Sequence, residues 1–423
     1  MYRKNAWENL AEDEKEQLSA FAKDYMAFLN NGKTERECVA EGVRQAEAKG
    51  FKNLMDVVKN GETLKAGDRV YRAWMNKDIM LFIIGEKPME CGMNILGAHI
   101  DSPRIDIKQN PLYEDEHLAY LDTHYYGGIK KYQWTTIPLA IHGVVVKKDG
   151  TKVEITVGEE ESDPIFYISD LLPHLAKDQV NKTLGEGIPG EKLNVIIGST
   201  PYDQSADGGV KLHMMQILNE KYGIVEQEFQ SAELSVVPAM KAREVGFDRS
   251  LIAGYGHDDR VCAHPAIRAL ADTDESVHTV MAILADKEEV GSGGNTGMQS
   301  GIFLDIMEEI CKSLGANFNV VKNNSKCLSA DVNAAYDPNF ADVYEKRNAA
   351  YLNYGIGLCK YTGARGKSGA SDASAETVGY VRGIFDRAKV IWQIAELGKV
   401  DAGGGGTVAM YMANRNITTL DAG

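Results

Sequence analysis

The apolar and polar positions in the first hundred residues follow first a helical period and then a strand period. Apolar residues recur at spacings of three and four between positions 7 and 30 (WENLAEDEKEQLSAFAKDYMAFLN), which predicts an amphipathic helix. Thr34 and Glu37 match a capping box, in which two side chains accept hydrogen bonds from backbone N–H groups at a helix start. A second helix is therefore expected directly afterwards. The short apolar runs 79–84 (IMLFII) and 94–98 (NILGA) are typical of buried strands.

The pattern changes between residues 102 and 237, where β-type runs dominate. In the stretch 144–158 (VVVKKDGTKVEITVG), Asp149-Gly150 separates two alternating segments, which predicts a hairpin. Strand and helix signals alternate again later, with a strand and a glycine-rich loop in 276–294 and a helix in 301–315.

These patterns predict an α/β fold that is interrupted by an insertion. The α/β domain is expected to consist of residues 1–101 and 238–423, and the inserted β-rich domain of residues 102–237. A chain of 423 residues with 44% hydrophobic residues is long enough to bury cores of this size.

The net charge and the cysteines limit which classes of function and which cellular compartments are possible. The net charge of −15 argues against a nucleic-acid partner, because the cation excess that neutralises phosphates is missing. The six cysteines are scattered and indicate reduced thiols rather than a disulfide framework. The N-terminus is polar and acidic, and no apolar run approaches the roughly 20 residues of a membrane span. We therefore expect a cytoplasmic protein without a membrane partner.

Two clusters of ionisable residues come first along the chain, one at the end of the first α/β segment and one near the start of the second. His99 and Asp101 follow the run NILGA, so the imidazole could bind a metal while the carboxylate orients the ring, although a surface histidine beside an acid is the simpler alternative. Asp258 and Asp259 are adjacent carboxylates that repel each other and favour a cation between them. Capping of the following helix would account for only one of the two.

Two further clusters follow candidate strands. Glu288 and Glu289 come after the apolar run 280–285, where one glutamate could ligate a metal and the other act as a general base, or both could lie in a charged turn. Asp331 arrives after the run 319–328 (NVVKNNSKCL), also interpreted as a strand. Each cluster is weak evidence alone, but all four are expected at the carboxyl ends of strands, where α/β sheets bind ligands.

The order of four motifs along the chain resembles that of the M18 metallo-aminopeptidases. The motifs are H-x-D, D-D-R, E-E-V-G-S and S-A-D. The matching segments are AHIDSPR (98–104), YGHDDRVC (255–262), DKEEVGSGG (286–294) and SADVNAAYDPNF (329–340). The resemblance implies a zinc-peptidase-like domain with a mixed sheet flanked by helices. It also implies that the inserted domain builds a homo-oligomer, expected to be a dodecamer, and that the substrates are peptides.

The resemblance further implies individual roles in a site for two divalent ions, expected to be zinc, with cobalt or manganese as alternatives. His99 and Asp331 would ligate one ion, Glu289 the other, and Asp258 would bridge both, with a cis peptide joining it to the next aspartate. Glu288 would be the general base.

Asp101 would be the carboxylate behind His99, and we count it with Glu288 as a catalytic residue. The expected activity is removal of N-terminal amino acids from peptides by a water molecule that two metal ions activate.

In the family, a last histidine ligand of the second metal follows a segment like TTLDAG, at which this sequence ends. The site that contains His99 is therefore expected to retain metal better than the second site. A non-catalytic or weakly active oligomeric scaffold is the alternative function.

Overall fold

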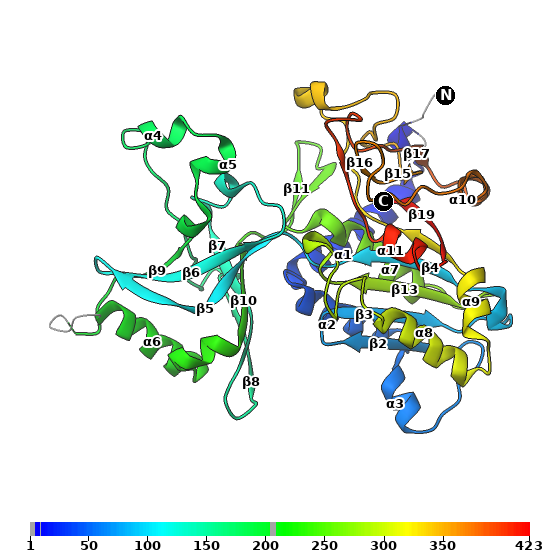
Figure 1. Ribbon diagram of the computed structural model, residues 1–423, viewed down its shortest axis with the longest axis horizontal. Helices are drawn as coiled ribbons and strands as arrows, with labels where there is room; N and C mark the ends of the chain where they lie inside the picture. The colour runs from blue at the N-terminus through cyan, green and yellow to red at the C-terminus, as the bar shows by residue number, and fades with distance from the viewer. Residues whose placement is uncertain (1–4, 9, 204–208) are drawn as a thin grey trace. The chain divides into compact units, whose positions relative to one another are not determined.

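The computed structural model describes residues 5–8, 10–203 and 209–423, and the chain divides into two compact units (Figure 1). Unit 1 consists of the residues up to 101 and from 256 onward, and unit 2 of residues 102–255. The sequence-based prediction ended the insertion at residue 237. Residues 238–255 belong to unit 2 because the strand ending at Pro238 continues into a small hairpin, β11 (Arg243–Val245) and β12 (Leu251–Ala253), before the next helix begins.

Unit 1 is built around a nine-stranded sheet with the order β1-β2-β3-β13-β4-β14-β19-β15-β17. In that order the strands are β1 (Lys52–Asn53), β2 (Arg69–Trp74), β3 (Asp78–Ile83), β13 (Val280–Ala285), β4 (Asn94–His99), β14 (Lys326–Ser329), β19 (Thr418–Ala422), β15 (Ile356–Cys359) and β17 (Trp392–Ile394). The central four, from β13 to β19, are mutually parallel, whereas β3 and β15 run antiparallel to their inner neighbours. The predicted mixed α/β sheet is confirmed.

Both faces of β3 and β13 are buried, which explains why these two sequences are almost continuously apolar. In β3, Met80 and Phe82 pack on one face, while Ile79, Leu81 and Ile83 pack on the other. The helices of unit 1 are α1 (Glu12–Asn31), α2 (Glu35–Ala48), α3 (Leu54–Lys59), α7 (His257–Ala271), α8 (Ile302–Ser313), α9 (Phe318–Asn324), α10 (Ala375–Arg387) and α11 (Ala409–Ala413). Among the described helices, none is both long enough and apolar enough to cross a bilayer.

The face that carries Met80 is covered by α3, α8, α9 and α11, and the opposite face by α1, α2 and α7. The capping box at the start of α2 is confirmed: the Glu37 N–H donates to Thr34 Oγ1 at 3.3 Å, and the Thr34 N–H donates to Glu37 Oε2 at 2.9 Å.

One predicted strand is wrong in its first half. Residues 318–324 form α9, and only Lys326–Ser329 are extended. The side chain of Asn317 accepts hydrogen bonds from the N–H groups of Asn319 and Val320, and this N-cap favours a helix over the strand that the two valines suggested.

Unit 2 is formed by a six-stranded antiparallel sheet with the order β8-β7-β10-β5-β6-β9. These strands are β8 (Lys152–Val157), β7 (Leu139–Val146), β10 (Ala232–Pro238), β5 (Arg104–Asp115), β6 (Leu118–Tyr126) and β9 (Val195–Gly198). The predicted hairpin is β7–β8, with Gly150 at φ +87° in its turn. The helices of this unit are α4 (Lys177–Val180), α5 (Leu184–Gly187) and α6 (Gly209–Tyr222).

Candidate metal centre

The carboxyl ends of β4, β13 and β14 place the predicted His99, the two glutamates and Asp331 at one edge of the sheet, whereas Asp258 comes from the start of α7 and not, as expected, from a strand end. His99 is the last residue of β4, and Asp331 follows β14 by two residues. Glu288 and Glu289 begin a short 3-10 turn, Glu288–Val290, just after β13. Parallel strands end at the same edge, so residues that are far apart in the sequence become neighbours.

His99, Asp258 and Asp331 converge on a common point. Each offers one ligand atom, and these atoms all lie within 4.8 Å of one another. His99 Nε2 is 3.1 Å from Asp258 Oδ1, with the imidazole 1% exposed and the aspartate side chain 55% exposed. Asp258 reaches the sheet edge from the start of α7, where it and Asp259 have non-helical backbone angles and are joined by the expected cis peptide bond.

Asp101 is fully buried behind this cluster and fixes three groups at once. The Nδ1 of His99 lies 3.0 Å from the Asp101 carbonyl oxygen and 3.2 Å from its carboxylate. The two carboxylate oxygens accept hydrogen bonds from the N–H groups of Glu288 and Glu289, both at 3.1 Å. With its Nδ1 proton bound in this way, the imidazole presents Nε2 to the cluster.

The two glutamates lie beside the cluster in a partly buried position. Glu288 Oε2 is 3.9 Å from His99 Nε2, and burial raises the pKa of Glu288 above its ordinary value. Burial, followed by the charge of Asp258, raises the pKa of Glu289 to about 8. Glu289 lies outside the three-residue group with converging ligand atoms.

The electrostatics of the centre favour a cation. Burial, with the neighbouring Asp259 as the next cause, raises the pKa of Asp331 to about 9. Burial opposes charge on His99, but its hydrogen bonds to Asp101 and Asp258 raise the pKa of the imidazole well above the ordinary value. Negative groups crowded out of water are stabilised by a bound cation, and a set of one imidazole and several carboxylates suits zinc, cobalt or manganese.

Two buried aspartates of the site were not assigned a role from the sequence. Asp259 accepts hydrogen bonds from the N–H groups of His99 (3.3 Å) and Val332 (3.1 Å), and so connects the segments that carry two of the converging residues. Asp421, near the end of β19, accepts a hydrogen bond from Thr407 Oγ1 at 2.7 Å. The available signal for Asp421 was a carboxylate within the short β-type segment ITTLDA near the end of the sequence.

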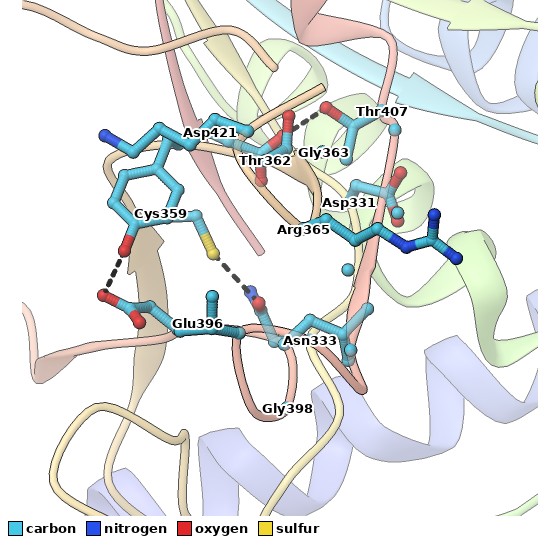
Figure 2. Close-up of a pocket in the computed structure, with 18 of the residues that line it drawn as sticks. Asp331, Asn333, Cys359, Thr362, Gly363, Arg365, Glu396, Gly398, Thr407 and Asp421 are labelled. Carbon is cyan, nitrogen blue, oxygen red and sulfur yellow. Dashed lines mark hydrogen bonds between the residues drawn. The ribbon is translucent and has the colours of Figure 1, made fainter. Parts of the chain in front are cut away.

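A cavity of about 660 Å³ opens onto the centre from within unit 1. Asp258, Glu288 and Asp331 form one part of its lining, and the loops 361–367 and 396–407 form another. Figure 2 shows Arg365, Glu396 and Thr407 around this cavity. The Tyr361 hydroxyl donates to Glu396 Oε1 at 2.9 Å. The cavity is large enough for a small organic molecule or a peptide end.

At the carboxyl edge of the parallel strands, an imidazole and carboxylates converge beside a glutamate. This arrangement is typical of metal-dependent hydrolases. The family profile described as "Aminopeptidase I zinc metalloprotease (M18)" matches residues 28–423. The chain belongs to this M18 family.

Individual relatives agree with this assignment. "Probable M18 family aminopeptidase 1" of Clostridium acetobutylicum is 51% identical over 99% of this chain and 91% of its own length. The crystal structure of the M18 aminopeptidase from Thermotoga maritima superposes with a TM-score of 0.95 at 45% identity, covering 100% of this chain and 93% of that one. The structure of aminopeptidase I from C. acetobutylicum gives a TM-score of 0.94 at 49% identity, covering 100% and 93%.

The predicted family and enzyme class are therefore confirmed, and the chain is a metallo-aminopeptidase. These relatives support the enzyme and not the alternative function, a non-catalytic or weakly active scaffold. The individual roles of the site residues remain predictions.

Proposed function

We propose that this aminopeptidase holds two divalent ions, preferably zinc, at the edge of its sheet. His99 and Asp331 would ligate one ion, Glu289 the other, and Asp258 would be shared between them. The observation that carries the proposal is the convergence of three ligand atoms within 4.8 Å of one another, on separate segments of the chain. Cobalt or manganese would suit the same donors.

A bound ion would supply Lewis-acid activation of the attacking water and of the scissile carbonyl. Glu288 lines the cavity, and its carboxylate lies 3.9 Å from the imidazole of His99. We assign Glu288 as the base that accepts the proton of the water and passes it to the leaving amine. The backbone of Glu288 is held by Asp101, which therefore positions both the base and the imidazole.

Glu288→Gln tests the proposed base. The amide keeps the shape of the side chain but cannot accept the proton, so kcat should fall about 10²- to 10⁴-fold on aminoacyl chromogenic substrates. Metal content, measured by elemental analysis, should stay at the wild-type level. Near-normal turnover in this variant would exclude Glu288 as the base.

His99→Ala is the matched comparison, because it removes a ligand rather than the base. Metal content should fall together with activity, and unchanged metal content would remove His99 from the ligand set. Both variants are measured after reconstitution with Zn, Co or Mn, so that the choice of ion does not limit the result.

The proposed assembly is a homo-oligomer, with a dodecamer as the preferred form. The mApe1 protein of S. cerevisiae, which shares the fold at 21% identity and a TM-score of 0.75, has been solved as a dodecamer. Unit 2 also exposes a set of large apolar side chains within residues 165–184, namely Ile165, Leu171, Leu172, Leu175, Val180 and Leu184. A group of exposed apolar side chains of this kind is more typical of a protein–protein interface than of a surface that stays in contact with solvent. All six cysteines are free thiols, which supports a cytoplasmic location.

A further inference from the structure

Residues Gly403–Gly406, here called the glycine strip, form part of the wall of the cavity that contains Asp258 and Glu288. The first half of the strip is glycine because the fold requires it. A Cβ on Gly403 would lie 2.1 Å from the carbonyl oxygen of Leu397, and one on Gly404, at φ +115°, would lie 2.3 Å from that of Gly363. Neither position has room for a side chain.

The second half of the strip has no such requirement. A Cβ on Gly405 would meet only a methyl group of Leu397 at 3.9 Å, and one on Gly406 would meet no atom within 4 Å. Both residues are exposed, and neither has a positive φ. The fold would therefore accept alanine at both positions, and their bare backbone leaves the adjoining space in the cavity free.

The main chain of Gly406 is available for a ligand. Within the described parts of the chain, its N–H and C=O groups make no hydrogen bond to protein atoms. An exposed backbone that has both a donor and an acceptor, and no side chain in front of it, can pair with another peptide backbone.

The strip is also held firmly in place. Thr407 follows it directly and donates a hydrogen bond to the buried carboxylate of Asp421 at 2.7 Å (Figure 2). At the other end, the Gly403 N–H donates to the carbonyl of Lys399 at 2.7 Å. Gly404 and Gly405 form β18, which pairs with β16 (Gly363–Ala364). A platform fixed at both ends loses little conformational entropy when it binds a ligand.

We propose that the main chain of Gly406 is a platform that binds the backbone of the peptide substrate beside the metal centre. The absence of side chains at Gly405 and Gly406 keeps this platform open to the substrate. The proposal rests on peptide hydrolysis at this cavity and adds the element that binds the peptide backbone there.

Gly406→Ala and Gly406→Val test the platform in the metal-reconstituted enzyme. A methyl group should raise KM for tripeptides about tenfold, the size expected for losing one or two backbone hydrogen bonds. Valine should raise KM further, since it fills more of the cavity. Because the platform binds ground state and transition state alike, kcat should change less than twofold. The thermal midpoint should not fall below that of the wild type, because the backbone at Gly406 accepts a side chain.

Two comparison variants separate the possible causes. Gly379 lies on α10, where a Cβ also meets no atom within 4 Å. Gly379→Ala should leave KM unchanged and raise the thermal midpoint slightly, because alanine stabilises a helix interior relative to glycine. Gly404→Ala should lower the thermal midpoint, because its Cβ collides with backbone.

Wild-type KM in both Gly406 variants would overturn the proposal, and so would a thermal destabilisation equal to that of Gly404→Ala. Absence of peptide hydrolysis by the wild type would instead refute the proposed function of the site.

Discussion

Asp259 illustrates how a single buried side chain organises the metal centre without facing the cavity. Its two carboxylate oxygens accept the N–H groups of His99 and Val332, at 3.3 and 3.1 Å. One of these groups belongs to a proposed ligand, and the other follows Asp331 directly. The position of the ligands relative to each other therefore depends on one carboxylate that is fully buried.

Asp259→Asn should weaken metal binding. An asparagine has one oxygen and one NH₂ group, so one of the two backbone N–H groups would lose its acceptor and face another donor. Residues that orient ligands typically change metal affinity 10- to 100-fold, and we expect a loss in this range from chelator competition. The exposed Asp305 on α8 provides the control Asp305→Asn. Equal affinities in the two variants would contradict the role of Asp259.

At the scale of elements, α7 both carries Asp258 and encloses a buried histidine. His264 is 0% exposed and packs against the rings of Phe21 and Phe28, with centroid distances of 5.2 and 5.1 Å. Burial, opposed by Asp24 and assisted by Arg268, lowers the pKa of His264 to about 4. The contact between α1 and α7 therefore stabilises the neutral imidazole.

The depressed pKa predicts acid sensitivity of this packing. An unfolded histidine titrates near 6.5, so between pH 6.5 and 4 the unfolded chain binds more protons than the folded chain. The free energy of unfolding should fall as the pH decreases through this window, by at most about 3 kcal/mol. His264→Leu should remove this part of the pH dependence in urea unfolding of metal-free protein. The control is His117→Gln, because the His117 side chain is 90% exposed.

Parallel pH profiles for the wild type and His264→Leu would show that the imidazole does not titrate in this window.

At the scale of the whole molecule, the apolar segment 165–184 of unit 2 should determine assembly. Leu175 and Leu184 are 67% and 74% exposed, and replacing both with glutamate would place charges in an interface that is expected to exclude water. Leu175→Glu/Leu184→Glu should therefore reduce the mass measured by light scattering. Val58→Glu, at an apolar position of unit 1 that is 42% exposed, is the matched control. An unchanged mass in the double variant would place the interface elsewhere.

The sequence alone determined the elements whose periodicity is strong. The apolar runs of β3 and β4, the capping box of α2 and the β7–β8 turn are local patterns, and each appears in the structure. Local patterns were misleading where two preferences competed. Two valines favoured a strand, and the Asn317 cap favoured α9.

The sequence also supplied the ionisable clusters and the family, because both depend on residue identity and order. It could not establish that His99, Asp258 and Asp331 share one centre, since these residues are far apart along the chain. The proximity of His99 and Asp331 comes from parallel pairing of β4 with β14, which brings the strand ends to one edge, and Asp258 reaches them from the start of α7. The supporting hydrogen bonds of Asp101, Asp259 and Asp421, and the open space beside Gly406, depend on distances between non-local backbone segments. Only tertiary packing sets those distances.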